Sequence, residues 1–70
     1  MTLQELQQMV DPQEPDREKA FFDAIMQIPD GDIHSLMAAL CFEVDPSQVT
    51  SQQRGWAKKL NYLYLYSSRG

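Results

Sequence analysis

Residues 50–66 read TSQQRGWAKKLNYLYLY, and they contain the chain's only tryptophan, all three tyrosines and three of its six basic residues. Thr50 and Gln53 stand three positions apart at the start of this stretch. This spacing predicts a capping box, in which each side chain binds the backbone N–H of the other residue. We therefore expect an amphipathic C-terminal helix over residues 50–67.

At about 100° per residue, this helix has two apolar sides. The first side is the expected core stripe, formed by Trp56, Ala57, Leu60, Leu63, Tyr64 and Ser67. The second side carries Tyr62, Leu65 and Tyr66 next to Lys58 and Lys59. A small monomer has use for one apolar face, so the second face indicates a partner. Tyr62–Tyr66 also alternates like a strand, but we favour a helix because a strand would find a pairing partner only in a second copy.

Three shorter helices are predicted before it. Residues 2–10 form the first, with Thr2 as its N-cap. Two prolines within residues 11–15 form a linker or an ordered turn, which predicts a loosely held first helix. Residues 15–28 form the second helix, and the third begins after the Asp32 cap and runs roughly to Glu43.

The predicted fold is an all-α bundle of three main helices with a short N-terminal helix, in one domain. Residues 1–14 form the N-terminal helix and linker, 15–44 a helical hairpin, and 50–67 the C-terminal helix. The hairpin core is expected at Phe21, Ile25, Leu36, Met37 and Leu40, and the last helix closes it through Trp56, Leu60 and Leu63. Phe42 lies opposite the buried side of the third helix, beside Ala38 and Ser35. This makes it a second candidate contact surface unless the last helix covers it.

The length of 70 residues limits the core. Chains below roughly 70–80 residues seldom gain more than about 3–5 kcal/mol from one core and usually need a staple. The lone Cys41 excludes an internal disulfide, and His34 with Cys41 cannot complete a zinc site, so no metal or cofactor is expected. Oligomerisation or a partner remains, with a marginal monomer as the alternative. A lone cysteine and no secretory leader predict the cytoplasm, and no apolar run approaches the ~20 residues of a membrane helix.

The net charge of −4 conceals an asymmetry. Residues 1–49 carry ten acids and two bases, giving −8, whereas residues 50–70 carry four bases and no acid, giving +4. The C-terminal helix therefore suits the chain's own acidic body, an acidic partner or a nucleic acid.

Catalysis is not expected. His34 follows Asp32 and resembles an oriented general base, but no nucleophile stands beside it. Cys41 lies two helical turns away, about 10 Å along the axis. Its place on the apolar stripe predicts a small core residue.

Two nucleic-acid alternatives remain open. Single-strand binders combine cations with stacking rings, and the candidate set here is Arg54, Trp56, Lys58, Lys59, Tyr62, Tyr66 and Arg69. A pI of about 4.6 weighs against this alternative. The acids form a solvated face, or they mimic a phosphate backbone and occupy the nucleic-acid site of another protein.

Residues 49–60 resemble a helix found in small phage-encoded accessory proteins. The positions that carry this resemblance are Val49, Thr50, Gln53, Trp56, Lys59 and Leu60, whereas Gly55 and Ala57 depart from it. The resemblance implies a short phage or prophage protein that binds a host protein and alters it without chemistry of its own. We therefore expect a non-enzymatic, inhibitory protein-binding module that uses a host-partner or homodimer interface. The predicted interface residues are Phe42, Trp56, Lys58, Lys59, Tyr62, Leu65 and Tyr66.

Overall fold

A computed structural model describes residues 1–67, with side chains up to Tyr66. Within this range the α-helices are α1 (Leu3–Met9), α2 (Arg17–Ile25), α3 (Ile33–Phe42) and α4 (Ser51–Ser67), and the 3-10 helix η1 (Pro46–Gln48) joins α3 to α4. The predicted all-α bundle is confirmed. Tyr62–Tyr66 lies inside α4, so the strand alternative is wrong.

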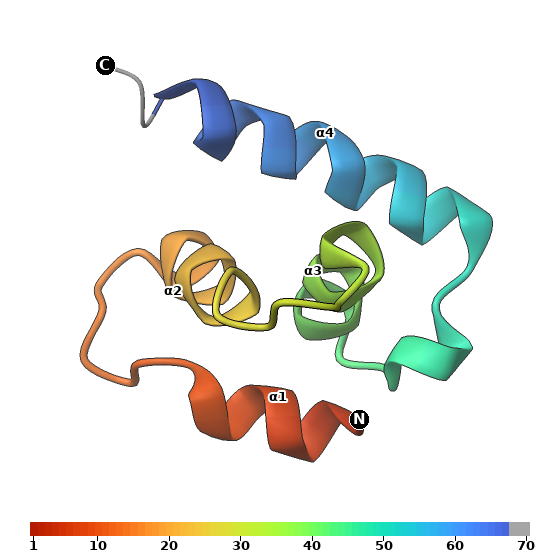
Figure 1. Cartoon of the computed structure of the whole chain (residues 1–70), viewed down its shortest axis with the longest axis horizontal. Coiled ribbons are helices and arrows are strands. Elements are labelled where there is room, and N and C mark those ends of the chain that lie inside the picture. The colour runs from red at the N-terminus through yellow and green to blue at the C-terminus, as the bar shows by residue number, and fades with distance from the viewer. Residues whose placement is uncertain (68–70) are drawn as a thin grey trace.

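Helix α3 is the centre of the molecule. Figure 1 shows α2 and α3 nearly end-on as a middle layer, with α4 lying across one side of them and α1 across the other. Helix α3 contacts α1, α2, α4 and η1, and five consecutive α3 residues, 36–40, are buried. Because helices cover α3 on both sides, Ala38 is buried as well, and the prediction that it belongs to an exposed contact surface is wrong.

Local side-chain caps start the four α-helices. Thr2 and Glu5 form a capping box at α1. Thr50 and Gln53 form another at α4, where the distances from the backbone nitrogen to the side-chain oxygen are 3.0 and 3.1 Å. The Asp32 carboxylate caps α3, as predicted. Asp16 caps α2, which is shorter than the predicted range 15–28. The helix begins later than predicted because its cap, Asp16, follows the two prolines. It ends earlier because the N–H groups of Gln27 and Ile28 bind the carbonyl three residues back, as in a 3-10 turn.

The N-terminal segment is firmly attached, contrary to the prediction. Leu6 is fully buried in the core, and the Leu3 N–H donates to the Asp45 carboxylate at 2.8 Å. The proline-containing link is an ordered turn, in which the Asp11 carboxylate accepts the Gln13 N–H at 2.8 Å.

Nearly half of the eleven buried core residues are small. These are the alanines Ala20, Ala24, Ala38, Ala39 and Ala57. The largest fully buried side chains are Leu6, Ile25, Met37 and the polar Asn61. Several larger apolar side chains remain at the surface, and most of these lie on or next to α4.

Candidate functional site

The buried side of α4 is centred on Ala57 and Asn61, both fully buried. The predicted core stripe is therefore wrong at Trp56 and Leu63, which are 47% and 68% exposed. Leu60 and Tyr64 are partly buried as part of the stripe, and the Ser67 side chain lies outside the described residues. The helix is turned further than the apolar pattern predicted, so that Asn61 faces α3.

Two polar contacts fix this orientation of α4 against the start of α3. His34 Nδ1 lies 3.0 Å from Asn61 Oδ1. The Arg54 guanidinium donates to both Asp32 carboxylate oxygens, at 2.9 and 3.2 Å. The Arg54 hydrogen bonds are the main reason why the pKa of Asp32 is lowered to about 2, and the same contact raises the pKa of Arg54.

Neither His34 nor Cys41 is placed as a catalytic group, because His34 is hydrogen-bonded to Asn61 and Cys41 is partly buried. The ring of His34 binds Asn61 rather than the Asp32 carboxylate, which accepts the His34 and Ser35 backbone N–H groups. Burial, together with the negative charge of Glu18, raises the pKa of the Cys41 thiol to about 11. At neutral pH this thiol is protonated and is a poor nucleophile.

The other end of α4 is packed against α2. The Phe22 and Tyr64 rings stack with centroids 5.4 Å apart, and the Tyr64 hydroxyl donates to the Asp16 carboxylate at 3.4 Å. Burial and the nearby acids raise the pKa of Tyr64. Contacts with α3 and α2 therefore hold α4 along its length, so that the positions of its outward-facing side chains are fixed relative to the rest of the domain.

One exposed flank of α4, which we name the tyrosine face, consists of Lys58, Tyr62 and Tyr66. Tyr62 is 42% exposed and Tyr66 66% exposed, and their ring centroids are 6.2 Å apart. The Lys58 ammonium lies 5.9 Å from the centre of the Tyr62 ring. The His34 and Tyr62 rings meet edge to face with centroids 5.9 Å apart, which links this face to the contact between His34 and Asn61.

A second surface, the tryptophan face, consists of the exposed side chains of Phe42, Trp56 and Leu63 and the partly buried Leu60. The Phe42 and Trp56 rings meet edge to face with centroids 5.3 Å apart, and Phe42 remains 41% exposed. Helix α4 thus covers Phe42 only in part. A hollow of about 490 Å³ between Phe42 and Trp56 is completed by Thr50, Gln52 and Gln53.

The single interface predicted from the sequence is therefore divided between these two faces. Lys58, Tyr62 and Tyr66 lie together on one flank, whereas Phe42 and Trp56 lie together on the other with Lys59 beside them. Leu65 is partly buried and belongs to neither face. Leu63 was missed as a surface residue because its spacing from Trp56 and Leu60 matched a core stripe.

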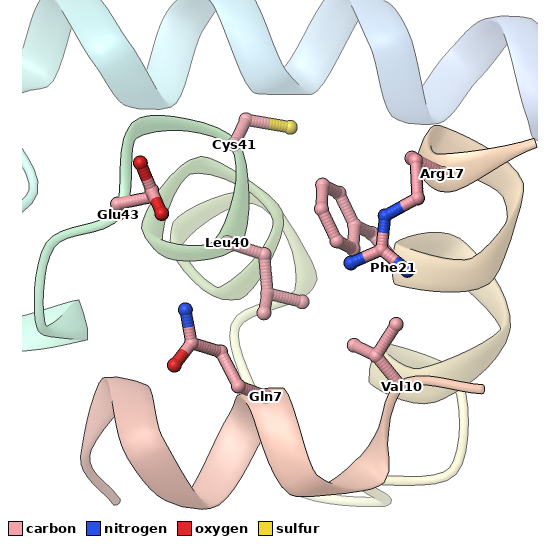
Figure 2. Close-up of a pocket in the computed structure, with 7 residues that line it drawn as sticks. All are labelled: Gln7, Val10, Arg17, Phe21, Leu40, Cys41 and Glu43. Atoms are coloured by element: carbon pink, nitrogen blue, oxygen red, sulfur yellow. The ribbon is translucent and has the colours of Figure 1, made fainter. Parts of the chain in front are cut away.

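Another hollow, shown in Figure 2, lies where α1, α2 and the end of α3 meet. Its volume is about 270 Å³, slightly below the roughly 300–1,000 Å³ of ordinary small-molecule pockets. The Arg17 guanidinium covers the Phe21 ring at 5.3 Å from its centre. The lining residues are Gln7, Val10, Arg17, Phe21, Leu40, Cys41 and Glu43. Sequence reasoning did not find this hollow, because its walls come from three separate helices.

Most of the acidic side chains form hydrogen bonds with the protein's own backbone. Six of the ten acids accept a backbone N–H: Glu5, Asp11, Glu14, Asp16, Asp32 and Asp45. These backbone N–H groups need an acceptor whatever the partner is, so part of the acidity of residues 1–49 has a structural cause.

Residues 1–67 contain no helix that is long and apolar enough to cross a membrane. In the same range, no three His, Cys, Asp or Glu side chains are grouped so that they could hold a metal ion. Comparisons with protein-family models, curated proteins and solved structures give no match to this chain.

Proposed function

We propose that this chain is a non-enzymatic protein-binding module that docks a partner protein on its tyrosine face. The observation that carries the proposal is the pair of mutually contacting, exposed rings of Tyr62 and Tyr66 on a helix that is fixed to the body. Tyrosine is among the residue types that dominate binding energy at protein interfaces, because it supplies a large apolar area with a polar tip.

The charge around these rings indicates the chemistry of the partner. Helix α4 carries Arg54, Lys58 and Lys59 and no acid. Arg54 is bound to Asp32, whereas Lys58 forms no ion pair within the described residues and lies over Tyr62. A surface with carboxylates around an apolar centre complements this face. The resemblance of residues 49–60 to phage accessory proteins suggests that the partner is a host protein and that binding inhibits it.

Nucleic-acid binding receives less support. Arg54 is engaged with Asp32, and Trp56 packs against Phe42 on the opposite flank from Lys58 and Tyr62. Arg69, the remaining member of the predicted basic and aromatic set, lies outside the described residues. The proposal that the acids mimic a phosphate backbone also receives less support, because six of the ten accept a backbone N–H inside the molecule.

The test is a pull-down from bacterial lysate with the tagged chain, before and after nuclease treatment. Tyr62→Ala/Tyr66→Ala is the variant, because both rings are exposed and alanine favours a helix. Met26→Ala, which removes a 49% exposed apolar side chain at the end of α2, is the matched control. We expect one stoichiometric protein with the native chain and with the control, and at least about thirtyfold weaker binding with the double variant.

Two results would contradict the proposal. If the double variant retains the partner, the tyrosine face is not the docking surface. If the captured material disappears on nuclease treatment, nucleic acid rather than protein is the ligand. Circular dichroism of each variant shows whether the helices are intact.

A further inference from the structure

The hollow in Figure 2 combines charges of both signs with an apolar lining. Arg17 lies on one side of it, and Gln7 and Glu43 lie on the other. Neither Arg17 nor Glu43 forms an ion pair within the described residues. The apolar part of the lining comes from Val10, Phe21, Leu40 and Cys41. A cation and an anion at this hollow are therefore both open to a ligand.

The Arg17 guanidinium is held in place and keeps its charge. It lies 5.3 Å from the centre of the Phe21 ring. The face of an aromatic ring attracts a cation electrostatically but leaves the N–H groups at the rim of the guanidinium unpaired. A planar guanidinium can donate two parallel hydrogen bonds to one carboxylate. The α2 side of the hollow is therefore suited to a carboxylate.

The backbone of Glu43 gives an independent indication. Glu43 ends α3 in the left-handed conformation, with φ 56° and ψ 50°, and within the described residues no other non-glycine residue has a positive φ. Glycine is the usual residue at such a helix end, because a side chain is disfavoured in this conformation. A carboxylate without an ion-pair partner gives nothing to the fold in return. A binding role accounts for a glutamate at this position.

We propose that this hollow binds a free apolar α-amino acid in its zwitterionic form. The ligand carboxylate pairs with Arg17, and the ligand ammonium pairs with Glu43. The apolar side chain packs against Phe21 and Leu40, and the Gln7 amide oxygen accepts a further ammonium N–H. The volume of about 270 Å³ lies slightly below the roughly 300–1,000 Å³ of ordinary small-molecule pockets, which favours a ligand as small as one amino acid.

The expected affinity is low. Arg17 and Glu43 are exposed, so solvent screens both charges, and a ligand of this size has few atoms with which to offset the cost of binding. We expect a dissociation constant of about 1 mM. None of the lining residues belongs to the tyrosine face, so this site and the proposed partner interface stand or fall separately.

The experiment is a titration of the full chain with L-leucine to about 20 mM at pH 7, followed by ¹H–¹⁵N correlation NMR. We expect saturable shifts at the backbone amides of Val10, Leu40 and Cys41. Three analogues each remove one recognised group: leucinamide lacks the carboxylate, N-acetyl-leucine lacks the ammonium, and glycine lacks the apolar side chain. Each analogue should bind at least about fivefold more weakly.

Matched variants test the two charges. Arg17→Gln and Glu43→Gln remove the charges with little change in size, and we expect each to weaken leucine binding by about fivefold. Lys59→Gln and Asp30→Asn make the same changes in net charge at exposed positions outside the hollow, and they should leave binding unchanged. A native chain whose spectrum does not move at about 20 mM leucine would overturn the proposal. So would leucinamide or N-acetyl-leucine that binds as well as leucine, or an equal loss in the control variants.

The variant Glu43→Gly separates binding from folding. Glycine adopts a positive φ without strain, so thermal unfolding should show a Tm equal to or above that of the native chain. Leucine binding should nevertheless weaken as in Glu43→Gln. A lower Tm would show that the glutamate side chain supports the fold, and it would remove the backbone argument for a binding role.

Discussion

The contact between the start of α3 and α4 depends on Asp32, and replacing Asp32 by alanine should destabilise the whole domain. Its carboxylate accepts the His34 and Ser35 N–H groups and the Ser35 hydroxyl, as well as the Arg54 guanidinium. Loss of an N-cap lowers the free energy of unfolding by about 1 kcal/mol. The lost hydrogen bonds of the Ser35 hydroxyl and the Arg54 guanidinium lower it further. We expect the free energy of unfolding to fall by about 1–2 kcal/mol. At about 4–8 °C per kcal/mol for a domain of this size, Tm should fall by roughly 5–15 °C.

The variant Asp32→Asn separates the cap from the charge. Asparagine still offers a carbonyl oxygen to the helix N-terminus but loses the ion pair, so its stability at pH 7 should lie a little below the native value and well above that of Asp32→Ala. Nearly half of each side chain in the pair is exposed, at 47% for Asp32 and 45% for Arg54, and exposed ion pairs contribute little.

The pH dependence follows from the lowered pKa of Asp32. Folding lowers this pKa from 3.8 to about 2, so the stabilisation by the charged carboxylate is fully present above pH 3.8. It is lost as the pH falls through about 2. The difference in unfolding free energy between the native chain and Asp32→Asn should therefore be constant from pH 7 to about 4.5 and should shrink below that.

Urea and thermal unfolding followed by circular dichroism provide the measurement. A native-like stability of Asp32→Ala would refute the idea that this carboxylate holds α3 and α4 together. An Asp32→Asn variant as unstable as Asp32→Ala would show that the ion pair, and not the cap, supplies the stabilisation. A difference that persists unchanged to pH 2 would refute the lowered pKa.

Further predictions concern the glycines and the cysteine. Gly55→Ala should raise the free energy of unfolding by about 0.5–1 kcal/mol, because a Cβ at Gly55 meets nothing within 4 Å in a helix; no gain in urea unfolding would contradict this. Gly31→Ala should lower it by about 1 kcal/mol, because a Cβ there lies 2.5 Å from Leu36 Cδ1 and 2.9 Å from Ile28 Cγ2; a more stable variant would show that the neighbours yield. Cys41, with its pKa raised to about 11, should react with iodoacetamide at pH 8 far more slowly than free cysteine and recover the normal rate in denaturant; equal rates in the folded chain would contradict its burial.

The helix starts were predictable because their chemistry is local. Each capping box joins a Thr to a residue three positions later, so the pattern of Thr2 with Glu5, or of Thr50 with Gln53, contains the whole interaction. The start of α2 was predicted too early, at Pro15, because proline suits the first turn of a helix; the Asp16 cap makes Arg17 the first residue of the helix. The firm attachment of α1 was not predictable, because Leu3 is held by Asp45, which is 42 residues away in the sequence.

The rotation of α4 could not be predicted for the same reason. An apolar pattern places leucine and tryptophan inward and asparagine outward. In the structure, Asn61 is turned inward to His34, which is 27 residues away in the sequence. The candidate residues on α4 were found because aromatic and basic side chains were in excess, but their division into two faces depends on this orientation.

The inward position of Asn61 also explains why so much apolar surface lies outside. Residues two positions apart on a helix point about 200° apart, so burying Asn61 necessarily turns Leu63 toward solvent. Within the described residues, the Asn61 Nδ2 has no hydrogen-bond partner, and a buried donor left unpaired costs about 1–3 kcal/mol. Turning α4 so that Leu63 faced the core would turn Asn61 toward solvent and would break its contact with His34. The observed orientation keeps the contact between Asn61 and His34 and leaves Trp56 and Leu63 at the surface of α4.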